Sequence, residues 1–216
     1  MKSPGSIETI KQDAQLSDRR SDGVNSTALM KMSIHNSLLI FAAALTLGAT
    51  ILSAQDTMKP KPTQQDAFDV IGIQVRTNNA KEATGDGAIP KQWQRLFAEG
   101  ILNQIPEKID QSITVVYSNY ASDWNGDYDY TLGAKVKSGT KPPQGMASVT
   151  IPAGRYLEFE SARGLGQTVV PEVWRQIWAY FQDPANPQRD YKADFERYEP
   201  SDPANVQAHV FIRVKP

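Results

Sequence analysis

The last ~150 residues of this chain carry one order of predicted elements twice, and this repeat limits the fold more than any other feature. In the first copy, β-branched residues predict a strand over Asp69–Val75. A helix then begins at Pro90, and two strands, Ser112–Tyr120 and Asp127–Val136, form a hairpin across a six-residue loop. One copy is therefore a strand, a helix and a hairpin.

The second copy has the same order of elements. Extended chain over Ala147–Ile151 and Gly154–Ser161 leads into a second predicted helix. The strands Tyr191–Glu199 and Val206–Lys215 then form a hairpin, again across six residues. The second copy therefore matches the first element by element.

The two hairpin loops, 121–126 and 200–205, begin 79 positions apart, so the repeat has a nearly constant offset. Each copy has an apolar helix face and a sheet face that it cannot bury alone. We therefore expect an α+β fold of duplicated β-α-β-β units related by a pseudo-two-fold axis. The predicted fold has an antiparallel sheet, two main helices and a central ligand cleft on the axis.

Both predicted helices are amphipathic, because their apolar side chains recur at intervals of three and four residues. These stripes are expected to face the sheet. They consist of Trp93, Leu96, Phe97 and Ile101 in the first helix and of Val170, Val173, Trp174, Ile177, Trp178 and Phe181 in the second.

The segment before the repeat is expected to direct the protein to its location in the cell rather than to form part of the folded domain. Residues 1–29 are polar and lack apolar periodicity, which predicts that they are disordered or not translated. Within residues 30–54, a basic start, the uncharged run Leu38–Leu52 and small residues predict a secretory signal peptide cleaved near Ala54. We therefore expect an exported, periplasmic or extracellular, protein. The alternative is an inner-membrane anchor in which residues 37–54 tether the domain.

Residues 55–67 separate this leader from the repeat. Their prolines and lysines predict a semi-extended linker. The folded domain is then expected to span residues 68–216.

Composition excludes several kinds of chemistry. The 23 Lys and Arg residues balance 24 Asp and Glu residues, so no positive field predicts a nucleic-acid partner. Cysteine is absent, which excludes disulfides and thiolate sites. Of two histidines, His35 lies in the leader, and strand alternation places His209 at the surface of the sheet. Since triads and most cysteine-free zinc sites need more histidine, we expect no metal and no cofactor. No feature of the sequence predicts an oligomeric state.

The second hairpin contains a carboxylate among aromatic residues. In Asp194-Phe195-Glu196-Arg197-Tyr198, alternation places Asp194, Glu196 and Tyr198 on one strand face. The 79-residue offset makes Glu196 equivalent to Tyr117, so both should approach the cleft from opposite halves. One interpretation of Glu196 is an ordinary carboxylate on a solvated face.

The other interpretation is a binding site, because a buried charge needs compensation. A flat, lipophilic cation would suit an acid between aromatic walls, since rings attract cations and the carboxylate neutralises them. Trp93 and Trp174 also fit an ordinary core. The residues predicted to bind the ligand, a small amphipathic or cationic organic molecule, are Glu196, Tyr198, Tyr117, Trp93, Tyr130 and Trp174.

These motifs resemble those of the GyrI-like, or AraC-type, effector-binding domains, and are most similar to the integron-associated stand-alone branch. The resemblance covers roughly Phe68 to the end of the chain. Its motifs are the runs Tyr117–Tyr120, Asp127–Tyr130 with Gly133, Ile151–Tyr156 and Asp194–Tyr198, together with the helix that carries Trp174 and Trp178.

The resemblance implies a duplicated strand-helix-strand-strand fold and a cleft with an acidic residue, here Glu196. Members of the family serve as sensors in multidrug regulators, as binders of lipophilic cations and, in some branches, as hydrolases. Residues 1–29 do not supply a helix-turn-helix, and export does not suit a regulator. Three functions remain open: ligand capture, hydrolysis with Glu196 as general acid/base, and a closed domain that acts through a partner protein.

Overall fold

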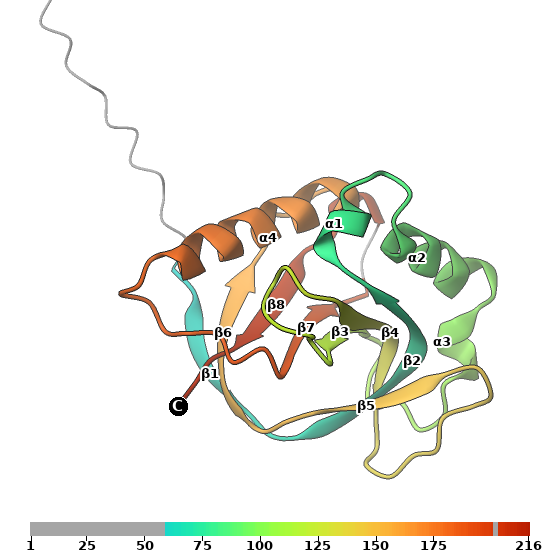
Figure 1. Cartoon of the computed structure of the whole chain (residues 1–216). Coiled ribbons are helices and arrows are strands. Elements are labelled where there is room, and N and C mark those ends of the chain that lie inside the picture. Colours follow the sequence, from blue (N-terminus) through green and yellow to red (C-terminus); the bar gives the residue numbers. More distant parts are fainter. Residues whose placement is uncertain (1–58, 201–202) are drawn as a thin grey trace, which may run out of the picture. The chain divides into compact units, whose positions relative to one another are not determined.

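The helices and strands occur in the predicted order and form one antiparallel sheet with helices on one face. The computed structural model describes residues 59–200 and 203–216 (Figure 1), so the predicted leader lies outside the described residues. The strands are β1 (Lys61–Gln65), β2 (Phe68–Thr77), β3 (Ile113–Ser118), β4 (Tyr128–Val136), β5 (Ala147–Ile151), β6 (Gly154–Glu160), β7 (Ala193–Tyr198) and β8 (Ala208–Arg213). The helices are α1 (Asn79–Glu82), α2 (Ala88–Ala98), α3 (Ile101–Gln104) and α4 (Gly166–Gln182), with a 3-10 turn over Pro203–Asn205.

The sheet confirms the predicted duplication. Its eight strands have the order β1-β6-β8-β7-β3-β4-β2-β5. Counted outward from the β3–β7 pair, β7, β8, β6 and β1 on one side correspond to β3, β4, β2 and β5 on the other. Within that pair Tyr117 lies opposite Asp194 and Val115 lies opposite Glu196. A shift of 79 positions, the separation of Tyr117 and Glu196, exchanges these two pairs. The pseudo-two-fold axis therefore passes between β3 and β7.

The outermost strands are exchanged between the halves. Strand β1 precedes β2 in the chain but pairs with β6, whereas β5 precedes β6 but pairs with β2. The predicted linker was therefore wrong over Lys61–Gln65, which is β1. This strand lacks an apolar alternation because it lies at the sheet edge, where Pro62 and polar residues are tolerated.

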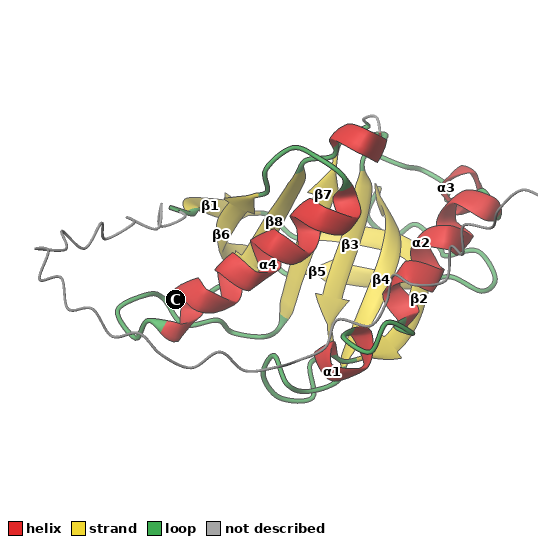
Figure 2. Ribbon diagram, turned by 90° about the horizontal axis from the view of Figure 1, so that it is seen from above, coloured by secondary structure: helices red, strands yellow, loops and turns green. Residues whose placement is uncertain are grey.

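Helices α2 and α4 lie on one face of the sheet, α2 over β2 and β4 and α4 over β6 and β8 (Figure 2), above the larger of two apolar clusters. The smaller cluster is on the opposite face, where the rings of Phe195 and Phe211 stack with centroids 4.4 Å apart. The prediction that Phe97 faces the sheet is wrong, because this side chain is 64 % exposed. It stacks on the outer side of Trp93, which is itself half-buried.

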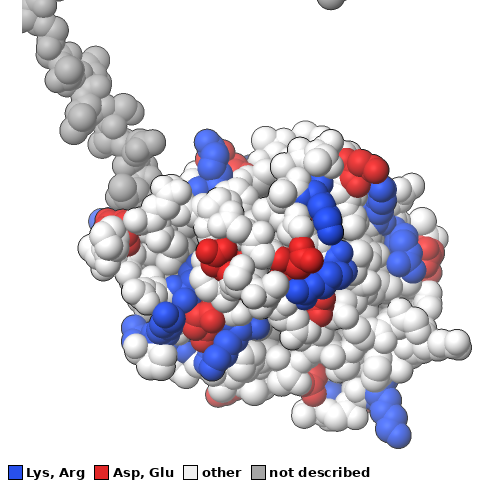
Figure 3. Space-filling model, viewed as in Figure 1, with Lys and Arg blue, Asp and Glu red and all other residues white. Residues whose placement is uncertain are grey.

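Two further features bear on partners. Among the described residues, no helix has the length and apolarity needed to cross a bilayer. On the face shown in Figure 3, basic and acidic side chains are interspersed, so that face carries no field of one sign. The predicted export, the tether and the absence of a nucleic-acid partner stay predictions.

Candidate functional site

The carboxylate of Glu196 is enclosed between the sheet and the helices. The residue lies on β7 and is 1 % exposed. Its Oε1 accepts hydrogen bonds from Tyr117 Oη at 2.9 Å and Trp174 Nε1 at 2.5 Å, and its Oε2 accepts one from Tyr198 Oη at 2.6 Å. All three donors are neutral. None of the ion pairs among residues 59–200 and 203–216 includes Glu196.

The hydrogen bond from Tyr117 confirms that the two positions related by the repeat meet at the axis. Tyr117 comes from β3 of the first half, while Glu196 and Tyr198 come from β7 of the second. Trp174 is placed by α4, whose apolar stripe faces the sheet as its spacing predicts. Each half therefore supplies donors to one carboxylate.

The remaining predicted site residues complete a wall of rings. Tyr117 makes edge contacts with Trp174 and Tyr130, at centroid distances of 5.0 and 5.4 Å. Trp93, from α2, meets the ring of Tyr198 edge-on at 5.3 Å. The structure thus brings all six predicted residues together. Their part in ligand binding stays a prediction.

The site differs from the predicted open cleft. Tyr117, Trp174 and Tyr198 are all more than nine-tenths buried, so their rings close over Glu196. A hollow of about 430 Å³ lies elsewhere and is lined by residues such as Ser148 and Lys192. The reason for the difference is physical: apolar rings from both halves bury each other.

Two tryptophans connect this enclosed site with the surface. Trp178 packs on Trp174 at 6.2 Å, and Trp124, from the β3–β4 loop, packs on Trp178 at 6.1 Å. Trp124 is 44 % exposed. Sequence reasoning placed Trp178 in the core and did not select Trp124. A tryptophan in a polar hairpin loop was the available signal.

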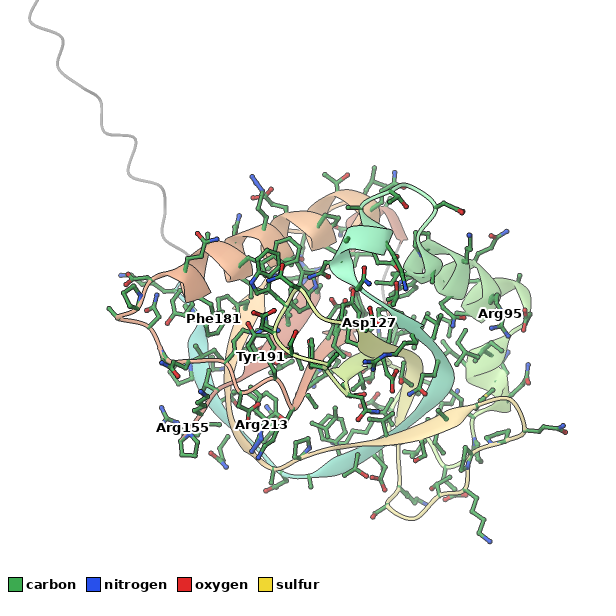
Figure 4. The ribbon with its side chains drawn as sticks, in the orientation of Figure 1. Arg95, Asp127, Arg155, Phe181, Tyr191 and Arg213 are labelled. Carbon is green, nitrogen blue, oxygen red and sulfur yellow. The ribbon has the colours of Figure 1, made fainter. Side chains whose placement is uncertain are left out.

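A second buried carboxylate near the axis has a different partner. Asp194, 0 % exposed, forms an ion pair with Arg189, whose guanidinium lies over the Tyr191 ring at 4.5 Å. Phe181, at the end of α4, lies on the same side of the molecule (Figure 4) and also faces that guanidinium, at 5.8 Å. Within the described part of the chain, Asp194 therefore has a cationic partner, whereas Glu196 does not.

The surroundings of Glu196 favour its neutral form. Burial raises the pKa of this carboxyl, and the hydrogen bonds from Tyr198, Trp174 and Tyr117 oppose that rise only in part. Burial, followed by the nearby Glu196 charge, also holds the pKa values of Tyr117 and Tyr198 well above their usual range. Both phenols therefore stay protonated and remain donors.

This pKa shift predicts a pH dependence of stability. Because the folded protein holds the Glu196 proton more tightly than the unfolded chain does, the contribution of this group is most favourable below about pH 4.5. It declines as the pH rises through the raised pKa. Denaturant unfolding between pH 4 and 8 should therefore show wild type losing stability relative to Glu196→Gln as pH increases. A difference between the two proteins that is independent of pH would contradict the shift.

Comparison with known proteins agrees with this geometry. The model of the family described as integron-associated effector binding protein matches residues 63–214. YobU of Bacillus subtilis (strain 168) is 29 % identical over 158 residues, which cover 71 % of this chain and 96 % of YobU.

Solved structures show the same fold. An integron cassette protein from the mobile metagenome of Vibrio cholerae superposes with a TM-score of 0.58 at 28 % identity, covering 72 % of this chain and 95 % of that one. SAV2435, bound to tetraphenylphosphonium, has a TM-score of 0.60 at 17 % identity, covering 73 % and 94 %. With a duplicated fold, an aromatic cluster on its axis and a family match over most of its length, the chain belongs to the integron-associated effector binding proteins and is a small-molecule-binding domain.

Proposed function

We propose that the Glu196 cluster binds a lipophilic organic cation. The observation that carries this proposal is the burial of Glu196. Its carboxylate is 1 % exposed and accepts hydrogen bonds from aromatic side chains, and no described residue is its cationic partner. Burying an unpaired carboxylate is unfavourable, and the raised pKa of Glu196 reflects that penalty. A cation that enters the cluster supplies the missing charge and stabilises the ionised form of Glu196 in a low-dielectric site.

The rings supply the other half of the recognition. Phenol and indole faces attract a cation and bury its apolar groups, which suits a charge dispersed over an aromatic framework. Because the rings pack tightly around Glu196, entry requires them to separate. The tryptophan series Trp174, Trp178 and Trp124 leads from Glu196 to the exposed hairpin loop, and we place the entry there.

Hydrolysis by Glu196 is less favoured. Both carboxylate oxygens already accept hydrogen bonds from rings, and the enclosed position leaves no solvent-exposed oxygen to activate water. Binding needs only that the rings move aside. We therefore expect capture of the ligand without turnover.

The proposal is tested by titrating the full chain with tetraphenylphosphonium, a probe chosen because a protein of the same fold holds it. We expect saturable binding of one cation per chain, with a change in tryptophan fluorescence. Glu196→Gln keeps the shape but removes the charge, and should weaken binding at least about 30-fold, as for other buried charged partners.

Two controls make the result specific. Glu199→Gln, an exposed carboxylate on the same segment, should leave the affinity unchanged. Triphenylphosphine oxide, which keeps the rings without the charge, should bind far more weakly than the cation. Equal affinity of wild type and Glu196→Gln for the cation, with both proteins folded, would refute the role of the carboxylate.

A further inference from the structure

On the sheet face that the helices leave uncovered, two glutamates and the histidine of the domain come together. Strands β6 and β8 are neighbours (Figure 1). Glu158 and Glu160 are on β6, and His209 on β8 lies directly opposite Glu160. Their neighbours Phe159 and Val210 belong to the cluster under the helices, so alternation turns these three side chains the other way. We propose that Glu158, Glu160 and His209 bind one divalent transition-metal ion of the Zn²⁺ type.

The donor atoms already lie at separations that suit a shared ion. His209 Nδ1 is 3.0 Å from Glu158 Oε1 and 3.7 Å from Glu160 Oε1. One ligand atom from each of the three residues lies within 4.8 Å of the others. Two ligands at ordinary zinc distances of about 2.0–2.2 Å are separated by roughly 3.0–3.5 Å. Small side-chain adjustments therefore suffice to place an ion between them.

The strands hold these side chains on a fixed frame. β6 is paired with β1 on one side and β8 on the other, and β8 is paired with β6 and β7. Because both strands have neighbours on each side, the separation and register of the three residues are set by backbone hydrogen bonds. A site built this way needs little ordering when the ion arrives.

The charge of the cluster also suits a divalent cation. Two carboxylates and a neutral imidazole carry two negative charges, and the basic side chains nearby neutralise them only weakly. Lys61 Nζ is 3.8 Å from Glu158 Oε2 on a side chain that is 76 % exposed. Arg197, opposite His209 on β7, pairs with Glu199 at 2.7 Å instead. A bound ion would replace the Lys61 contact and the direct contact between His209 and Glu158.

The ligand types indicate which ions fit. Imidazole nitrogen with two carboxylates favours zinc and its first-row neighbours over calcium and magnesium, which prefer oxygen ligands alone. The Glu160 side chain is 55 % exposed, so the ion would keep positions open to water. The sequence analysis predicted no metal because the domain has one histidine. The proximity of the two glutamates to that histidine depends on the pairing of β6 with β8, which the sequence did not predict.

The experiment uses the full chain stripped of metal and titrated with Zn²⁺ by calorimetry, with Co²⁺ absorption as a readout of coordination. We expect one site per chain, a higher melting temperature with Zn²⁺ and a Co²⁺ spectrum with nitrogen and oxygen ligands. His209→Ala and Glu160→Gln should each weaken Zn²⁺ binding by about tenfold or more. His35→Ala, the other histidine of the chain, should bind as wild type does.

Glu160→Gln keeps the test valid if His209→Ala fails to fold, because Glu160 is exposed and its loss should leave the melting temperature in EDTA unchanged. Zn²⁺ affinity that is the same in wild type, His209→Ala and Glu160→Gln would overturn the proposal, as would the absence of saturable binding. Either result would show that the three side chains contact one another without forming a metal site.

Discussion

Replacing Asp194 by alanine is expected to lower the free energy of unfolding by about 3–5 kcal/mol, the range for removing one partner of a buried ion pair. The Arg189 guanidinium, whose side chain is 4 % exposed, would lose its counter-charge without gaining water. Asp194 also accepts hydrogen bonds from Tyr120 Oη at 2.8 Å and from the Arg213 backbone N–H at 2.8 Å. Their loss leaves two further donors unsatisfied.

Equilibrium denaturation in urea measures this effect. Asp86→Ala is the matched control, because Asp86 forms an ion pair with Lys91 at the surface, where its side chain is 89 % exposed. That variant should not change stability measurably. The double variant Arg189→Met with Asp194→Leu should recover part of the loss, since no buried charge remains. A loss in Asp194→Ala no larger than in Asp86→Ala would contradict the buried ion pair.

Gly133→Ala is expected to destabilise the domain by about 3 kcal/mol or more, at the upper end of the range for overpacking a core. Gly133 on β4 lies directly opposite Gly72 on β2. A Cβ atom added to Gly133 would lie 1.9 Å from the carbonyl oxygen of Ile71. The obstacle is backbone, which cannot rotate aside, so β2 and β4 would have to separate within their paired region.

A matched glycine separates this clash from the general effect of a methyl group. Gly166, at the start of α4, has only Val206 Cγ2 near its position, at 3.9 Å from an added Cβ. Gly166→Ala should therefore leave stability unchanged or raise it slightly, since alanine favours a helix. Thermal unfolding of the two variants, side by side, measures the difference. Similar melting temperatures would show that the strands tolerate the methyl group.

The sequence predicted the contacts around Glu196 because the repeat relates each position in one half to an equivalent position in the other. The constant offset made Glu196 equivalent to Tyr117, and strand alternation placed Glu196 with Tyr198, so a contact between all three was predictable. The structure confirms it through the hydrogen bonds to Glu196. Such a prediction needs no knowledge of which strands pair.

What the sequence did not predict depends on neighbours that only the sheet brings together. The strand Lys61–Gln65 is polar, because an edge strand has little apolar surface to bury. The approach of Glu158 to His209 depends on the register of β6 and β8. The closure of rings over Glu196 is a property of packing from both halves, and no local pattern encodes it.

The exchange of outer strands has a consequence for synthesis. During translation the first half emerges before the second, yet β1 finds its hydrogen-bonding partner only when β6 has left the ribosome. The first half also waits for β5 to cover its own edge. Since such distant contacts form slowly, neither half is expected to mature alone, and the nascent domain should complete its sheet only after β8 has emerged.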